Sequence, residues 1–132
     1  MIQAAKDAHI HHNIIELEKG FETVVGERGI TLSGGQKQRV SIARAIIKQP
    51  DILIFDDCLS AVDTETEDII LRNLKRIMKG KTSVIISHRI SSLEHSDLIL
   101  VMNEGKIIEQ GTHADLLAKN GYYASLNEKQ KG

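Results

Sequence analysis

One stretch decides how this chain folds, Thr31-Leu32-Ser33-Gly34-Gly35-Gln36-Lys37-Gln38-Arg39-Val40. Ser33, followed three residues later by Gln36, forms a capping-box pattern that predicts the start of a helix. Gly34 and Gly35 leave the backbone N–H groups of the first turn bare, and such a helix start can receive a phosphate. The same pattern also fits a tight loop before an ordinary helix, so the neighbouring sequence must decide between the two.

The residues that follow predict a helix and then a strand. Apolar residues recur at helical spacing over residues 34–48, and Pro50 prevents the helix from continuing. Four apolar residues at 52–55 then end in Asp56 and Asp57, which predicts a fully buried strand over residues 52–56. Ligands of open α/β sheets bind at the carboxyl ends of the strands, so these two acids are candidate site residues.

Four motifs follow one another in this chain: Leu-Ser-Gly-Gly-Gln at 32–36, Ile-Leu-Ile-Phe-Asp-Asp at 52–57, Ser-Ala-Val-Asp at 60–63 and Ser-His-Arg at 87–89. Their order and spacing resemble the nucleotide-binding domain of ATP-binding cassette (ABC) transporters of the exporter type. The resemblance covers nearly the whole chain and matches the C-terminal half of that domain. It implies an α/β fold, namely an incomplete P-loop NTPase (RecA-like) core with a mostly parallel sheet and an N-terminal helical subdomain.

The resemblance also implies a domain organisation and partners. Residues 1–49 would be the helical subdomain, which carries the family's signature motif, Leu-Ser-Gly-Gly-Gln at 32–36. Residues 50–132 would be the C-terminal part of the ATPase core. The domain would hydrolyse ATP at the cytoplasmic face of a membrane and power transport. Its partners would be a second nucleotide-binding domain and the coupling helices of a transmembrane domain, contacted by Thr23–Gly29. A plain connector is the alternative interpretation of that segment.

The motif residues receive their roles from the same resemblance. Asp56 would hold Mg²⁺ through a water molecule, and one carboxylate is sufficient because magnesium keeps most of its water shell. Asp57 stands where the family usually has a catalytic glutamate, and His88 matches the switch histidine that contacts the γ-phosphate. The alternative for the two acids is a pair of solvent-facing carboxylates at a strand end.

The remaining site residues would serve a second subunit. Ser33, Gly34, Gly35 and Gln36 match the signature, which contacts the γ-phosphate of ATP bound to the other subunit. Asp63 matches the loop that links the two ATP sites of the dimer. The implied cofactors are therefore ATP and Mg²⁺, and the signature would act in trans, that is, on nucleotide held by a partner.

Asp57 departs from the family pattern. Aspartate is one methylene shorter than glutamate, so its carboxylate falls about 1–1.5 Å short of the attacking water, and such a misplacement can cost about a hundredfold in rate. We therefore expect a heterodimer in which this chain's own site is slow and its intact signature completes an active site on a different subunit. The alternative is a homodimer with two equivalent slow sites.

The sequence contains no G-x-x-x-x-G-K-S/T phosphate loop. Gly80-Lys81-Thr82 imitates the end of one but precedes a predicted strand, so we interpret it as a helix stop. We therefore expect a fragment that binds ATP weakly by itself, and a non-catalytic partner module is the alternative function. A DNA-repair or chromosome-organising ATPase is disfavoured by the exporter-like segments Val25–Gly29 and Glu109–His113.

Composition excludes several other classes. The net charge of the 132 residues is -1 and aromatic residues make up 3%, so nothing indicates nucleic acid as a partner. The single cysteine, Cys58, excludes an internal disulfide and is interpreted as a small core residue. His9, His11 and His12 are interpreted as ordinary helical residues, because no carboxylate or cysteine stands at ligand spacing.

The rest of the chain is predicted to alternate helices and strands. We expect helices at 3–8, 13–18, from 63 or 64 to Gly80, 90–95, 112–118 and 122–127, a buried strand at 82–86, and a hairpin of 98–102 with 106–110. The lysine-rich tail from Lys129 to Gly132 is expected to fray. Because half of the family's sheet is not in this sequence, we expect an exposed edge, exposed apolar surface and a tendency to aggregate or to form oligomers.

Overall fold

The computed structural model describes residues 1–132, which form two compact units, Met1–Ile86 and Ser87–Gly132. Each unit has its own hydrophobic core. None of the helices combines the length and the apolar composition needed to cross a membrane. The division predicted at residues 49 and 50 concerns the family's subdomains rather than contact units, and it stays a prediction.

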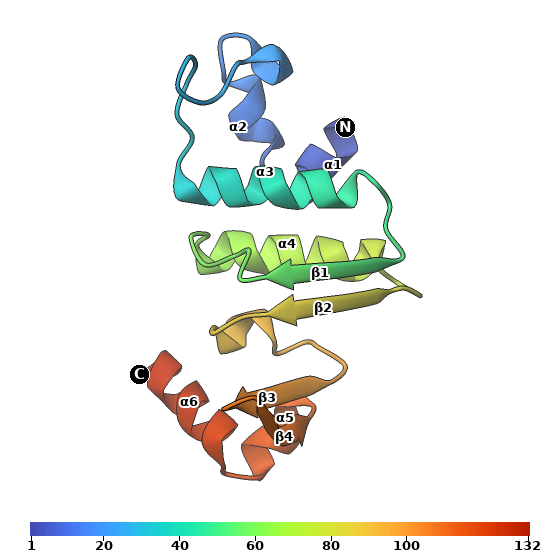
Figure 1. Ribbon diagram of the computed structural model, residues 1–132, viewed down its shortest axis with the longest axis vertical. Helices are drawn as coiled ribbons and strands as arrows, with labels where there is room; N and C mark the ends of the chain where they lie inside the picture. Colours follow the sequence, from blue (N-terminus) through green and yellow to red (C-terminus); the bar gives the residue numbers. More distant parts are fainter. The chain divides into compact units, whose positions relative to one another are not determined.

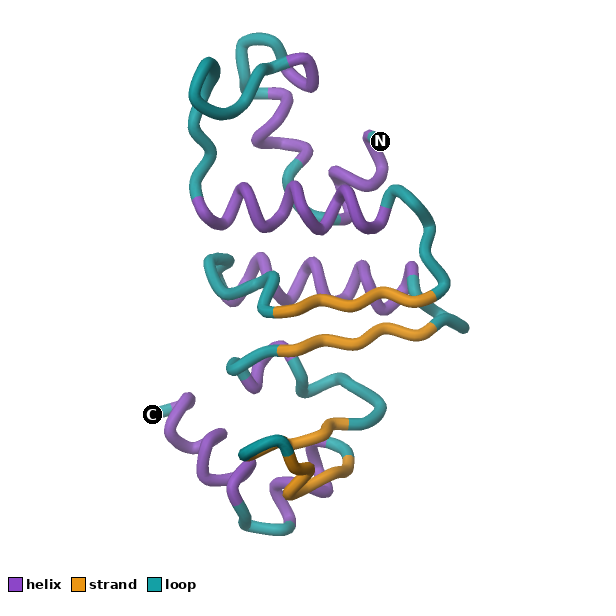
Figure 2. The backbone as a smooth tube through the Cα atoms, in the orientation of Figure 1, coloured by secondary structure: helices purple, strands orange, loops and turns teal.

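The first unit combines helices with the two-stranded sheet β1–β2. Its elements are α1 (Ile2–Asp7), α2 (His11–Ile15), the 3-10 helix η1 (Gly20–Glu22), α3 (Gly34–Ile46), β1 (Ile52–Asp56), α4 (Thr64–Ile77) and β2 (Thr82–Ile86) (Figure 1). The two strands pair in parallel, from Ile52 opposite Thr82 to Asp56 opposite Ile86. Figure 2 shows the two strands side by side. The predicted strands and the helices α3 and α4 are confirmed, and α2 begins two residues and ends three residues earlier than expected.

The core of the first unit lies between its long helices and one face of β1. α3 contributes Ile42 and Ile46, and α4 contributes Ile70 and Leu74, all of them buried. Leu53 and Phe55 of β1 complete this core, and Cys58 is only partly buried beside it. The apolar faces that helical spacing and strand alternation produce in α3, α4 and β1 therefore pack together in a single core.

The prediction that both strands are fully buried was wrong. Ile52 and Ile54 of β1 are 65% and 62% exposed, and Val84 and Ile86 of β2 are 44% and 51% exposed. A parallel sheet becomes buried only when helices cover both of its faces, and in this unit helices cover one. The result is an uncovered apolar sheet face, consistent with the expected exposed apolar surface.

The second unit is built on a hairpin and two helices. Its elements are the 3-10 helix η2 (Ile90–Ser92), β3 (Ile99–Asn103), β4 (Lys106–Gly111), α5 (His113–Ala118) and α6 (Tyr122–Lys131). The hairpin strands are antiparallel, and its two turn residues, Glu104 and Gly105, have φ values of 48° and 76°. Two positive φ angles are typical of a type I′ turn, whose twist matches that of the strands. Ile90, Ile99, Leu116 and Tyr123 form the core.

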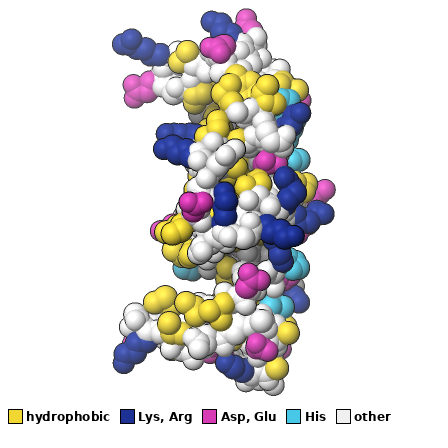
Figure 3. All heavy atoms as spheres, turned by 90° about the vertical axis from the view of Figure 1, so that its right-hand side faces the viewer, with side chains coloured by type: hydrophobic (Ala, Val, Ile, Leu, Met, Phe, Trp, Pro, Cys, Tyr) yellow, Lys and Arg dark blue, Asp and Glu magenta, His cyan; other side chains and the backbone are white.

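Two expectations for the second unit were wrong. The predicted helix at 90–95 is a single 3-10 turn, Ile90–Ser92. The tail does not fray, because α6 runs to Lys131 and the N–H of Gly132 still donates to the carbonyl of Glu128. Figure 3 shows hydrophobic side chains gathered over this unit, and the hairpin residues Met102 and Ile107 are 62% and 53% exposed.

Candidate functional site

The predicted capping box at the start of α3 is confirmed. The N–H of Gln36 donates to Ser33 Oγ over 3.1 Å, and the N–H of Ser33 donates to Gln36 Oε1 over 2.9 Å. The Ser33 hydroxyl accepts in this cap, so its O–H remains able to donate. The N–H groups of Gly34 and Gly35 stand in the first helical turn, where no carbonyl of the same helix can reach them. The helix start therefore offers hydroxyl and backbone donors to an anion.

The two signature glycines differ in their surroundings. A Cβ placed on Gly35 would lie 2.8 Å from the carbonyl oxygen of Ala61, closer than real Cβ atoms come to such an atom. A Cβ on Gly34 would lie 3.4 Å from the Ala61 side chain, an ordinary van der Waals contact. Gly35 is thus required for the close approach of α3 to the loop 57–63, whereas Gly34 is not required for it.

Gln38 joins the signature helix to the same loop. Its Nε2 donates to Ser60 Oγ over 2.8 Å, and its Oε1 accepts from the N–H of Ala61, also over 2.8 Å. Ser60 Oγ in turn donates to the carbonyl of Asp57 over 3.4 Å. A chain of hydrogen bonds therefore runs from α3 to the backbone of the predicted catalytic acid.

The two predicted acids stand at the carboxyl end of β1, as expected. Both side chains are exposed, and the N–H of Asp57 extends the strand pairing by donating to the carbonyl of Ile86 over 2.8 Å. Asp57 adopts the left-handed conformation with φ of 55°. Aspartate is one of the few residues that visit this region readily, so the backbone here is better suited to aspartate than to glutamate.

Asp63 begins α4, as its sequence position predicted. Its Oδ2 accepts a hydrogen bond of 3.0 Å from the N–H of Thr66. This backbone donor stabilises the charged carboxylate and holds the pKa of Asp63 below its usual value. Leu59 and Val62, buried on either side of Ser60 and Ala61, anchor the loop between β1 and α4 in the core.

His88 belongs to the second unit and lies at its start, two residues beyond the last residue of β2. Its side chain is exposed, and its carbonyl accepts a hydrogen bond of 2.6 Å from Gln130 Nε2. Beside it, the N–H of Arg89 donates to Ser87 Oγ over 3.0 Å. The backbone around this histidine is therefore held by hydrogen bonds from both directions along the chain.

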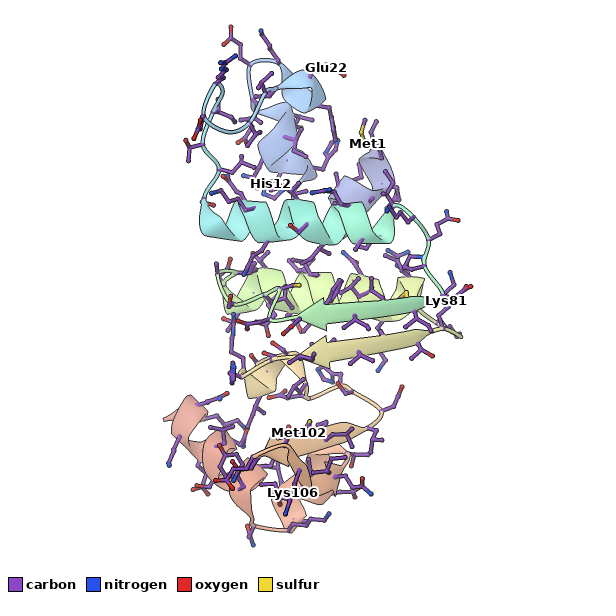
Figure 4. All side chains as sticks on the ribbon, in the orientation of Figure 1. Met1, His12, Glu22, Lys81, Met102 and Lys106 are labelled. Atoms are coloured by element: carbon purple, nitrogen blue, oxygen red, sulfur yellow. The ribbon has the colours of Figure 1, made fainter.

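The segment Gly80-Lys81-Thr82, which the sequence indicated as a helix stop, links α4 to β2. Lys81 precedes β2 at the end opposite Asp56, as Figure 4 shows. α4 ends at Ile77 with Met78 as its C-cap, and Gly80, with φ of 79°, lies in the turn between α4 and β2. The helix-stop interpretation of this segment is confirmed. Arg39 of α3 contacts the histidine-containing N-terminal segment, where its Nη1 donates to the carbonyl of His9 over 2.6 Å and to Asn13 Oδ1 over 3.0 Å. Burial, followed by the charges of His12 and Arg39, lowers the pKa of His9.

Comparisons with known proteins agree with this geometry. A family model described as "ABC transporter" matches residues 3–60. The chain is 54% identical to the probable multidrug resistance ABC transporter ATP-binding/permease protein YheI of Bacillus subtilis (strain 168), over 98% of the chain and 22% of that protein. The chain is also similar to a solved structure of a bacterial Atm1-family ABC exporter with ATP bound. The sequence identity is 46% and the TM-score is 0.92, and the match covers 99% of this chain and 23% of the exporter chain.

The chain belongs to the ABC transporter family. A further relative is the ATP-dependent lipid A-core flippase of Pseudomonas fluorescens (strain Pf0-1), 54% identical over 95% of the chain and 21% of the flippase. The chain thus spans about a fifth of the length of the curated relatives that it matches. The α/β fold is confirmed as part of an ABC ATPase, a P-loop NTPase fold.

Sequence reasoning missed two residues that organise the ABC motifs. Gln38 lies three and four residues after the signature glycines, so helical spacing alone places all three on one face of α3 and could have indicated it. Gln130 stands 42 residues from His88, in the tail that was expected to fray. No local pattern could have indicated that contact.

The ABC family model covers Asp56 and Asp57, whereas Asp63 and His88 lie beyond the matched residues.

Proposed function

We propose that this chain is part of the ATP-hydrolysing motor domain of an ABC exporter, and that its signature, Ser33–Gln36, contacts ATP held by a second nucleotide-binding domain. The observation that carries the proposal is the start of α3, where a capping box presents the Ser33 hydroxyl and the N–H groups of two glycines. The identity to exporters over nearly the whole chain supports it. The names of the relatives differ in cargo, so the proposal concerns the motor alone.

The remaining site residues would serve this chain's own nucleotide. Asp56 presents an exposed carboxylate at the end of β1, which suits Mg²⁺ because that ion prefers a few carboxylates and keeps its water. Bound Mg²⁺ would neutralise charge on the phosphates. Asp57 would orient the attacking water, His88 would contact the γ-phosphate and Asp63 would contact the partner domain across the dimer.

The test of the trans contact uses Gly34 rather than Gly35, because only Gly34 has room for a side chain within this unit. In the complete transporter, Gly34→Leu is expected to abolish most ATP hydrolysis, since the side chain would occupy the space of the phosphate. Arg44→Ala, an exposed change on the same helix, is the matched control and should hydrolyse like the wild type. Full-rate hydrolysis by Gly34→Leu would contradict the proposal.

We further propose that this chain's own ATP site hydrolyses more slowly than the site that its signature completes on the other subunit, and a variant at Asp57 tests this difference. In the complete pair of subunits, Asp57→Glu should raise single-turnover hydrolysis at this chain's own site, because the longer side chain reaches the water. The left-handed backbone at this position favours aspartate over glutamate by at most about 1–2 kcal/mol, so the folded fraction is measured in parallel. An unchanged rate in fully folded protein would refute a site slowed by aspartate. A homodimer is distinguished by purifying the chain without any second subunit.

We also propose that residues 23–29 contact the coupling helices of a transmembrane domain at the cytoplasmic face of the membrane. Val24 and Val25 are 62% and 49% exposed, and the loop is closed by hydrogen bonds from the N–H of Gly26 to Ile30 and from the N–H of Ile30 to Val24. A compact loop that exposes two valines can pack against an apolar partner. Val24→Asp should reduce transport more strongly than ATP hydrolysis, and equal losses would contradict this contact.

The alternative is a partner module that gives its signature to another cassette and binds no nucleotide. A titration of residues 1–132 with Mg·ATP and an Asp56→Ala variant of the complete transporter separate the two. Saturable binding of Mg·ATP would contradict the partner module. If these residues alone bind no Mg·ATP, loss of hydrolysis at this chain's own site in Asp56→Ala favours the motor domain, and an unchanged rate favours the partner module.

A further inference from the structure

We propose that Gln130, in the last turn of α6, is a positioning residue for His88, so that the C-terminal helix sets the geometry of the switch histidine. The inference rests on the proposed function, in which His88 contacts the γ-phosphate. Gln130 Nε2 donates to the carbonyl of His88 over 2.6 Å, and Gln130 Oε1 accepts from the N–H of Ile90 over 2.8 Å.

The backbone conformation explains why a glutamine serves here. Arg89, between the two bonded peptide groups, is extended, with φ of −100° and ψ of 119°. In an extended chain the carbonyl before a residue and the N–H after it point to the same side, as they do toward a neighbouring strand. A side-chain carboxamide carries both a donor and an acceptor and can bind the two groups at once. Gln130 thus takes the place of a strand neighbour for the segment that follows His88.

α6 is itself fixed at its other end, so the contact is more than a chance approach of a mobile tail. Tyr123 is 2% exposed in the core that also contains Ile90. Its N–H donates to Glu109 Oε1 over 2.8 Å, and its hydroxyl lies 2.7 Å from His113 Nδ1. Gln130 follows Tyr123 by seven residues, two helical turns, and therefore lies on the same face of α6.

Two local contacts also hold the backbone next to His88. Ser87 Oγ accepts from the N–H of Arg89 over 3.0 Å, and Ile90 is buried with 3% exposure in the core of the second unit. The hydrogen bond from Gln130 adds a contact to the carbonyl of His88 itself. Loss of this bond would let the His88 peptide rotate, and a displacement of about 1 Å at a catalytic group can cost a hundredfold in rate.

The test compares three variants of the complete transporter with the wild type. Gln130→Ala removes both hydrogen bonds, whereas Gln130→Glu keeps an acceptor for Ile90 but loses the donor to His88. Lys129→Ala, an exposed neighbour, is the matched control. We expect both Gln130 variants to lower kcat for ATP hydrolysis by about tenfold or more, with KM changed by less than about twofold, and Lys129→Ala to leave both unchanged.

Amide hydrogen exchange supplies a second readout that does not depend on activity. Exchange at Ile90 should increase in Gln130→Ala and stay protected in Gln130→Glu, so a decreased kcat in Gln130→Glu cannot be assigned to unfolding of this segment. A wild-type kcat in Gln130→Glu, while His88→Ala loses hydrolysis, would overturn the role of Gln130 alone. Full-rate hydrolysis by His88→Ala would overturn the proposed function, and the inference with it.

Discussion

The sharpest consequence of the fold concerns two adjacent glycines that the sequence cannot distinguish. Gly34→Ala and Gly35→Ala should differ in stability, because only Gly35 approaches a backbone atom of another segment. The added Cβ would lie 2.8 Å from the Ala61 carbonyl oxygen in Gly35→Ala, and 3.4 Å from the Ala61 side chain in Gly34→Ala. Contact with a backbone oxygen cannot be relieved by a rotamer change, so α3 or the loop 57–63 must move.

The magnitude follows from two opposing effects. Alanine is favoured over glycine inside a helix by up to about 1 kcal/mol, and both variants gain this in similar measure. Gly35→Ala additionally carries the cost of overpacking, about 1–3 kcal/mol. The free energy of unfolding of Gly35→Ala should therefore lie about 1–3 kcal/mol below that of Gly34→Ala.

The assay is native-state hydrogen exchange of the peptide that spans residues 31–46, measured in the complete protein. A difference of about 1–3 kcal/mol corresponds to a factor of about 5–160 in the population of the opened helix. Gly35→Ala should also weaken protection of the Ala61 N–H, which donates to Gln38. Equal protection in both variants would refute the conclusion that close approach to Ala61 requires Gly35.

Three further predictions follow from local contacts. Ser33→Ala should lower the stability of α3 by about 1 kcal/mol, measured by urea unfolding, because it removes the cap on Gln36. The lowered pKa of Asp63 means that its charged form stabilises the fold above about pH 4 and that this contribution is lost as pH falls through its folded value, so Asp63→Asn should show a shallower acid dependence of stability. Gly29→Ala should disrupt the loop 23–29 and transport, since a Cβ there would overlap the Val24 carbonyl; unchanged transport would contradict the contact proposed for that loop.

Much of the local structure could be predicted from sequence. The caps of α3, α4 and α5 depend on side chains that bond a backbone group three residues away, as Ser33 does with Gln36 and Thr112 with Asp115. The turn at Glu104 and Gly105 depends on two adjacent dihedral preferences. These interactions are complete within a few residues, so the pattern of residues specifies them.

The candidate site was predicted as a set of residues rather than as an arrangement. The motif order indicated the family, and the acids at the end of β1 and the cap at the start of α3 lie where expected. Burial was misjudged at β1 and β2, because apolar composition cannot say which face a neighbouring layer covers. The end of α6 was misjudged because lysines indicated a solvated tail.

The sequence by itself determined where the long helices α3 and α4 and the strands lie, which residues cap these helices, and which family the chain belongs to. Only the tertiary structure decided that Gln38 binds the loop at Ser60 and Ala61, and that Gln130 binds on both sides of Arg89. These partners are separated by 22 to 42 residues. Such contacts form only after packing has closed the chain between them, and no local preference of either partner encodes that closure.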